Sequence, residues 1–143
     1  MKDSVTITIP SHPKYLSAVR DVTVRMAGIS GVSETTTEEL KLAVDEACAN
    51  VIKHAYHGDA GGKIVVRFKV TPKKFTVVID DGGEKTDPAR VVGRSLTDVR
   101  PGGLGVHFIK KTFDVFEFDP KRARGNRLRL IKHLGDKHGN QTV

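Results

Sequence analysis

The stretch LAVDEACANVIKHAY, residues 42–56, decides the fold prediction for this chain. It predicts a helix on which Glu46, Asn50 and His54, spaced four residues apart, stack on one side. Apolar side chains occupy most of the remaining circumference, namely Leu42, Val44, Ala47, Val51 and Ile52. A helix that is apolar nearly all round packs against other structure on more than one side. The presence of a carboxylate, an amide and an imidazole on such a helix therefore requires a functional explanation.

The bulk composition indicates a globular chain. At 143 residues, with 38% apolar and 29% charged residues, it is expected to form one domain over residues 1–134, followed by a flexible polar tail over 135–143. No apolar run approaches the roughly 20 residues that span a bilayer. The single cysteine, Cys48, cannot form an internal disulfide. We therefore expect a cytoplasmic protein without a membrane partner.

The net charge of +7 is concentrated at one end of the chain. Seven Lys or Arg residues lie between positions 121 and 143, against the single acid Asp136. No aromatic residues alternate with them, so nucleic acid bases would have little to stack on. This distribution favours a solvated basic edge or an acidic protein partner over nucleic acid.

The remaining elements follow from hydrophobic periodicity and turn residues. Strands are predicted over residues 5–9, 63–70, 74–80, 114–118 and 126–131, and helices over 15–27, 36–57 and 106–113. Thr36 with Glu39 three residues later forms a capping box at the start of the second helix. Hairpins dominate after that helix, with no β-α-β alternation. The sequence therefore predicts an α+β two-layer sandwich, with helices on one face of a mixed, mainly antiparallel sheet.

Asp81 continues the apolar row of its predicted strand, in which Phe75, Val77 and Ile79 alternate. A carboxylate that faces a core needs a strong hydrogen-bond donor, which a ligand amine or guanidinium can supply. The alternative is a turn, DDGG, in which the aspartate caps backbone amides.

Glycines at 102, 103 and 105 precede the last predicted helix. They let the backbone approach an anion, and the helix that follows offers free N–H groups and the positive end of its dipole. The alternative is a flexible loop with an ordinary helix start.

Glu46 and Asn50 supply two oxygen ligands one helical turn apart, which suits Mg²⁺ beside phosphate oxygens. Glu46 can instead act as a base toward a hydroxyl. The alternative is a polar pair on the solvent edge of the helix. His54 and His57 lack a third ligand nearby, so zinc is not expected.

The order and spacing of these motifs resemble one family. Glu-x-x-x-Asn on a helix, Asp-x-Gly after a strand, Gly-x-Gly at a helix start and Gly125-x-x-Leu128-x-Leu130 in a last strand resemble the Bergerat (GHKL, histidine-kinase-like) ATP-binding fold. EACANVIKHAY and GGLGVHFIK, together with Asp87-Pro88, are similar to its anti-sigma-factor serine/threonine kinase subfamily. The resemblance covers roughly residues 5–134.

The resemblance implies a role for each matching residue. Asn50 would hold Mg²⁺, which bridges the phosphates of ATP, and Glu46 would activate the attacking group. Asp81 would accept a hydrogen bond from the adenine amino group, and Gly83 would let the chain pass close to the base. In the segment Gly103-Leu104-Gly105, the glycines would bring backbone amides to the phosphates.

The resemblance also implies a transcription regulator. Such a kinase phosphorylates a serine or threonine of an anti-anti-sigma (STAS-type) protein, sequesters a sigma factor in the alternate state, and forms a homodimer. Two positions depart from the family: Asn126 stands where Thr is usual, and Thr86 where an aromatic residue is common. They keep open a nucleotide-gated binding module without kinase activity. Arginines at 90, 94 and 100 lie on the short predicted lid, where any of them can reach the γ-phosphate or simply be solvated.

Overall fold

The computed structural model describes residues 3–86 and 103–135, with the backbone alone at 103 and 104. Its five strands form one sheet in the order β1-β2-β3-β5-β4, and every pairing among them is antiparallel. The strands are β1 (Ser4–Pro10), β2 (Lys63–Val70), β3 (Lys74–Asp81), β4 (Val115–Phe118) and β5 (Asn126–His133). The predicted α+β sandwich is confirmed, and the sheet is antiparallel throughout the described strands.

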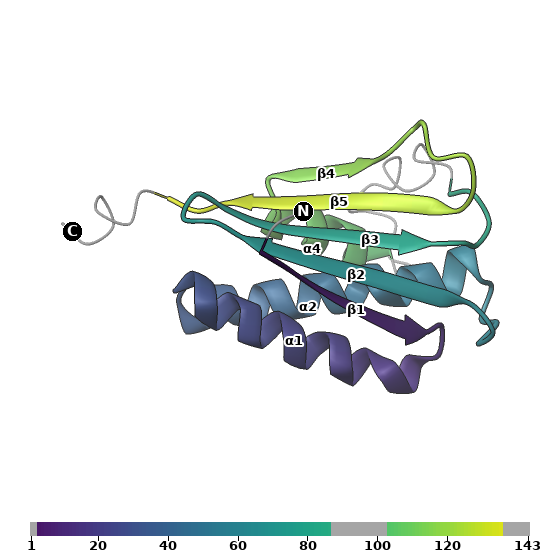
Figure 1. Ribbon diagram of the computed structural model, residues 1–143, viewed down its shortest axis with the longest axis horizontal. Coiled ribbons are helices and arrows are strands. Elements are labelled where there is room, and N and C mark those ends of the chain that lie inside the picture. Colours follow the sequence, from purple (N-terminus) through teal and green to yellow (C-terminus); the bar gives the residue numbers. More distant parts are fainter. Residues whose placement is uncertain (1–2, 87–102, 136–143) are drawn as a thin grey trace.

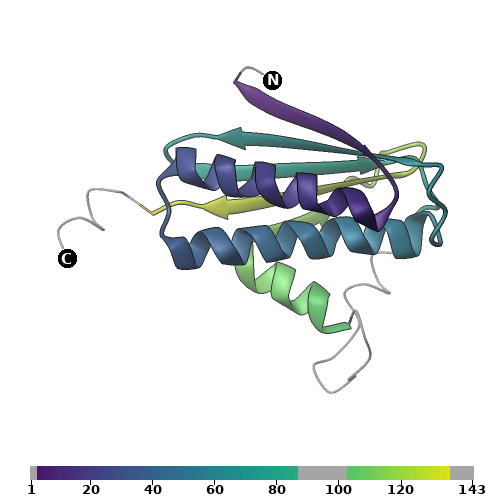
Figure 2. The same ribbon diagram turned by 90° about the horizontal axis from the view of Figure 1, so that it is seen from below.

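The helices cover one face of this sheet (Figure 1). They are α1 (Leu16–Ser30), α2 (Glu34–Asn50) and α4 (Gly103–Thr112), with a short 3₁₀ turn η1 (Pro13–Tyr15) and a π-helical segment η2 (Val51–Ala55). Figure 2 shows the three α-helices side by side over the strands, with α2 between α1 and α4. No helix in the described ranges is both long and apolar enough to cross a bilayer.

The core lies between the helix layer and one face of the sheet. Because side chains alternate between the faces of a strand, every second residue of β2, β3 and β5 points toward the helices. These inward residues are almost fully buried, namely Ile64, Val66, Phe68, Phe75, Val77, Ile79, Leu128 and Leu130. Asp81 lies at the end of the same row, as its spacing predicts.

Helix α2 is the central element of the helix layer. Leu40, Val44 and Cys48 on it have no exposed surface, and burial together with the nearby Asp45 raises the pKa of the Cys48 thiol to about 12. Such a thiol stays protonated and unreactive at neutral pH. The expectation of an apolar surface buried all round is wrong at Leu42, which is 49% exposed.

The predicted capping box is also wrong. Helix α2 begins at Glu34, and its N-cap is Ser33, whose side chain accepts a hydrogen bond from the Thr36 backbone amide at 3.1 Å. Ser33 has the extended backbone that an N-cap needs, so it satisfies a free amide of the first turn. Thr36 therefore lies inside the helix, not at its start.

The helix changes geometry directly after Asn50. In the π-helical segment η2 the backbone amide of Tyr56 donates to the carbonyl of Val51, five residues earlier. A π-turn takes up more residues than an α-turn, so the predicted stack of three polar residues does not extend regularly to His54. Glu46 and Asn50 remain one α-helical turn apart.

Candidate functional site

Asp81 and Asn126 face each other at the end of neighbouring strands β3 and β5. Both are 5% exposed, and the Asn126 side-chain amide donates to Oδ1 and Oδ2 of Asp81 at 3.0 and 3.3 Å. The Gly83 backbone amide donates to Asp81 Oδ1 at 2.9 Å. The turn-capping interpretation of Asp81 therefore describes a real contact, yet Oδ2 accepts only the longer bond from Asn126 and has the capacity to accept another.

The electrostatic state of Asp81 follows from its position. Burial raises the pKa of this carboxyl above its ordinary value, although hydrogen bonds from Gly83 and Asn126 partly offset that effect. A buried carboxylate with a raised pKa is under-solvated, so it gains from an incoming amino group. Asp81 therefore has the chemistry of an acceptor for a ligand amino group.

Asn126 also fixes the loop that follows β3. Its side-chain amide donates to the Glu84 carbonyl at 2.9 Å, and its Oδ1 accepts from the Thr86 backbone amide at 2.7 Å. All the polar atoms of this carboxamide are thereby used. A threonine, which is usual at this position in the family that the sequence resembles, has a single hydroxyl and would not make all of these bonds.

The second part of the site joins α2 to the first turn of α4. A methyl group added at Gly105 would overlap the Glu46 carboxylate, so these two residues are in direct contact. Gly103 and Leu104 form the start of α4, where the backbone amides have no partner within the helix. The structure thus brings the predicted base and the predicted phosphate-binding glycines together.

The helix connects the two parts of the site. Ala55, at the end of η2, accepts a hydrogen bond from the Glu84 amide at 2.7 Å, and a methyl group on Gly83 would collide with its carbonyl. Glu46 and Ala55 lie nine positions apart along this continuous helical stretch, and half-buried Asn50 lies between them.

Asn50 is the residue that the family resemblance assigns as the Mg²⁺ ligand. Its side chain has no hydrogen-bond partner within residues 3–86 and 103–135, so its carbonyl oxygen is available to a ligand. Those same residues contain no group of three or more His, Cys, Asp or Glu side chains that could hold a metal ion. One amide oxygen nevertheless suits Mg²⁺, which keeps several waters and binds phosphate oxygens beside few protein ligands. The predicted lid arginines at 90, 94 and 100 lie outside the described residues.

Tyr56 is a site residue that the sequence analysis missed. Its hydroxyl accepts a hydrogen bond from the Gly82 amide at 2.7 Å and donates to the Lys63 carbonyl at 2.6 Å, while its ring packs against Gly62. It therefore ties the loop after β3 to the chain that follows the helix. The sequence feature that could have identified it is its position as the aromatic last residue of the stretch 42–56, next to Ala55.

Gly125, the first residue of the last motif in the sequence, lies directly against Asp81. It has a φ of 63°, and a side chain there would overlap the carbonyl of Asp81. Only glycine adopts that conformation without strain and allows the β4–β5 loop to approach the end of β3 so closely.

Replacing Gly125 by alanine is expected to destabilise the protein by about 3 kcal/mol, because the backbone strain and the overlap with Asp81 act together. Urea unfolding measures the change. The matched control is Gly28→Ala in α1, where an added methyl meets nothing within 4 Å. That variant is expected to gain up to about 1 kcal/mol in helix propensity. Equal effects at the two positions would contradict the close approach at Gly125.

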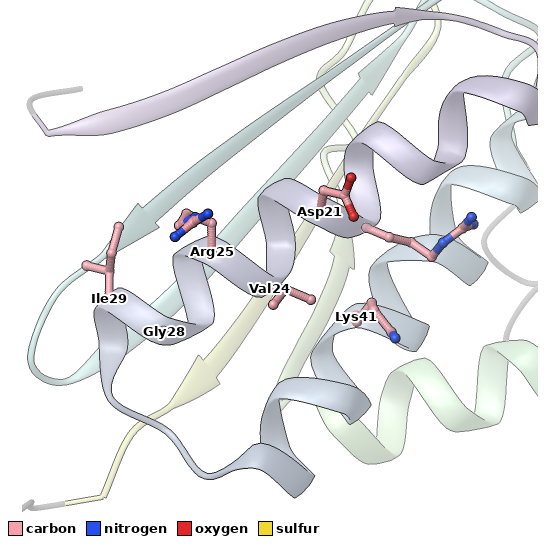
Figure 3. Close-up of a pocket in the computed structure, with 7 residues that line it drawn as sticks. Asp21, Val24, Arg25, Gly28, Ile29 and Lys41 are labelled. Atoms are coloured by element: carbon pink, nitrogen blue, oxygen red, sulfur yellow. The ribbon is translucent and has the colours of Figure 1, made fainter.

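A separate groove lies on the outer surface of the helix layer (Figure 3). Its lining residues come from α1 and α2 and are Arg20, Asp21, Val24, Arg25, Gly28, Ile29 and Lys41. None of them is a predicted nucleotide-site residue. The groove is therefore distinct from the site built around Glu46 and Asp81.

The chain has relatives among serine-protein kinases. The serine-protein kinase RsbW of Listeria innocua is 33% identical over 122 residues, which cover 80% of this chain and 78% of that protein. The RsbW protein of Bacillus subtilis is 28% identical over 140 residues, covering 92% of this chain and 86% of its own.

Solved structures share the fold. The mycobacterial sensor histidine kinase MprB superposes with a TM-score of 0.55 at 18% identity, over 90% of this chain and 97% of that one. A blue-light activated histidine kinase of Erythrobacter litoralis gives a TM-score of 0.55 at 17% identity, over 92% of this chain and 44% of the other. Residues 9–132 match the family described as histidine kinase-like ATPase domain. The chain therefore belongs to the histidine kinase-like ATPase family, as its sequence motifs indicated.

Proposed function

We propose that this protein is an ATP-dependent protein serine/threonine kinase that phosphorylates an anti-anti-sigma partner of the STAS type and sequesters a sigma factor. The observation that carries the proposal is the contact between the Glu46 carboxylate and Gly105, at the start of α4. The carboxylate that would act as the base thus lies beside the helix terminus that would receive the phosphates. The RsbW relatives, which are serine-protein kinases, support the same reaction.

The two ends of the site would hold the two ends of ATP. Asp81 would accept the adenine amino group, with Gly83 and Asn126 shaping the pocket edge around it. Gly103, Leu104 and Gly105 would offer backbone amides to the phosphates. Mg²⁺, held by the Asn50 carboxamide oxygen together with phosphate oxygens, would neutralise part of the phosphate charge.

In the transfer step, Glu46 takes the proton of the partner's serine or threonine hydroxyl. The hydroxyl oxygen forms a bond to the γ-phosphorus, the bond from that phosphorus to the β–γ bridging oxygen breaks, and ADP leaves with the electron pair. Most of the rate enhancement in such reactions comes from positioning and charge stabilisation. Helix α2, which carries both Glu46 and Asn50, would provide that positioning.

Phosphorylation would act as a switch between partners. A phosphoryl group adds about −1.5 to −2 charges to the partner surface and can break its complex with the kinase. The kinase, released from its phosphorylated partner and acting as a homodimer in the cytoplasm, would then bind the sigma factor and thereby regulate transcription. The whole domain, residues 1–134, would be needed for this cycle, and we assign no role to residues 135–143.

The proposal is tested with a purified STAS-type protein and γ-labelled ATP with Mg²⁺. We expect micromolar ATP affinity, roughly −8 kcal/mol by calorimetry, and label on one serine or threonine of the partner. ATP binding with partner association but no labelled residue would instead identify a nucleotide-gated binding module. The carboxamide of Asn126 bonded to Asp81 is the feature that favours this second function.

Tyr56→Phe is expected to weaken ATP binding about tenfold, because the loop after β3 loses the hydroxyl that holds Gly82 and Lys63. Calorimetric titration with ATP measures the loss. The control is Tyr15→Phe, since Tyr15 is 36% exposed and its hydroxyl has no hydrogen-bond partner in the described part of the chain. Unchanged affinity in Tyr56→Phe would show that the loop does not need this hydroxyl.

A further inference from the structure

Within the described residues, no helix covers the sheet face opposite α1, α2 and α4. All three of these helices pack on the other face (Figures 1 and 2), and most outward side chains of the strands are partly or fully exposed, whereas Asp80 is buried. The strand register places these outward residues in rows across the sheet, for example Thr6, Arg67, Val78, Arg129 and Glu117. An antiparallel sheet commonly exposes one face, but such a face is then mainly polar and of mixed charge.

This face carries an excess of positive charge. Its basic side chains are Lys63, Arg67, Lys69, Lys74, Arg122, Arg127 and Arg129, and its acids are Asp80, Glu117 and Asp119. We call this set of residues the arginine face. With seven basic groups against three acidic ones, its net charge is clearly positive.

Three arginines share one carboxylate near one end of this face. Arg127 binds Asp80 through two hydrogen bonds of 2.7 and 2.9 Å, Arg67 adds one of 2.8 Å, and Arg122 lies 4.0 Å away. Burial alone would raise the pKa of Asp80, but the hydrogen bonds from Arg127 and Arg67 outweigh it and hold that pKa below its ordinary value. The carboxylate is therefore ionised and orients the guanidinium groups without neutralising them, which leaves N–H donors for a second anion.

The surface between the charges is apolar. Val65, Val78, Ile131 and Val115 point outward and are half-buried, and Thr76 lies among them. No Phe, Tyr or Trp points outward from the described strands, so bases have nothing to stack on. Guanidinium groups set among aliphatic side chains suit a protein segment that carries carboxylates and small apolar residues.

We propose that the arginine face is a docking surface for an extended acidic segment of a partner protein. Asp80 and Asp81 are neighbours in β3 but project to opposite faces of the sheet, one toward these arginines and the other toward Asn126. The segment can therefore bind while the nucleotide site is filled. The docking surface does not depend on kinase activity.

The probe is a fluorescent polyglutamate peptide, followed by anisotropy at low salt with and without ATP. We expect binding that weakens as NaCl is added and that ATP leaves unchanged. Arg129→Glu is expected to weaken it about tenfold, and Arg25→Glu on the helix layer, which makes the same charge change, by less than about twofold. Because Arg129 pairs with Glu117, Lys69→Glu on β2 provides a second variant that leaves this pair intact.

Three results would overturn the proposal. Equal losses in Arg129→Glu and Arg25→Glu would show that only net charge matters, and absence of binding at low salt would show that the face takes no acidic peptide. Tighter binding of a single-stranded DNA oligonucleotide of matched charge would assign the face to nucleic acid. If Asp81→Asn abolishes ATP binding and leaves the peptide affinity intact, the two sites are separate.

Discussion

Glu46→Gln is expected to reduce phosphoryl transfer to the partner by about 10²- to 10⁴-fold, the range typical of a lost general base. ATP affinity is expected to stay within about threefold of the parent value. Glutamine preserves the shape of the side chain beside Gly105, so the first turn of α4 keeps its position. Glutamine cannot accept the hydroxyl proton at neutral pH, so we expect the rate of the chemical step to fall while ATP binding is retained.

Single-turnover transfer with saturating ATP separates the chemical step from binding. The matched control is Glu39→Gln, an exposed carboxylate on the same helix that makes the same change of charge. It is expected to transfer normally. Full transfer by Glu46→Gln would mean that Glu46 only packs against α4, and the base would then have to be sought elsewhere.

Much of the fold was predictable because it depends on local periodicity. The alternating rows of β2, β3 and β5 predicted both the strands and the buried position of Asp81. The family resemblance assigned Glu46 and Gly105 to one nucleotide site although they are far apart in the sequence, but it did not predict the contact between them. Periodicity cannot bring distant elements together, whereas a set of motifs in a known order can.

The parts that were missed depend on tertiary contacts. The π-helical segment Val51–Ala55 has an ordinary helical sequence, and its geometry goes together with the hydrogen bond from the Glu84 amide to Ala55. The Tyr56 hydroxyl bonds two segments that sequence spacing does not relate. Ser33 and Thr36 are both suitable N-caps by residue type. In the structure the N-cap is Ser33, which has the extended backbone conformation that this position needs.

Asp81→Asn is expected to lower ATP affinity about 100-fold, because a charged acceptor for the adenine amino group becomes a neutral amide that can present a donor instead. The same variant is expected to be as stable as the parent protein or up to about 1 kcal/mol more stable at neutral pH. Asparagine can still accept from Gly83, and it removes a buried charge. Loss of function with a gain of stability is typical of a binding residue.

The neighbouring variant Asp80→Asn is the matched control. It removes the charge that three arginines share, so it is expected to cost about 2 kcal/mol of stability while leaving ATP affinity unchanged.

The stability changes at Asp80 and Asp81 depend on pH in opposite ways, because folding lowers the pKa of the first carboxyl and raises that of the second. Asp81 has a raised pKa in the folded state, so the stability it contributes is complete in acid and is lost as the pH rises through that pKa.

Asp80 has a lowered folded-state pKa, so its contribution is complete above the ordinary carboxyl pKa and is lost as the pH falls through the lower folded value. Urea unfolding at about pH 7 and about pH 3 therefore distinguishes the two aspartates. The gain from Asp81→Asn should shrink in acid because the parent carboxyl is then protonated, and the penalty from Asp80→Asn should shrink because its ion pairs are weakened. An Asp81→Asn protein that binds ATP normally would contradict the assignment of Asp81 to the adenine end of the site, whatever its stability.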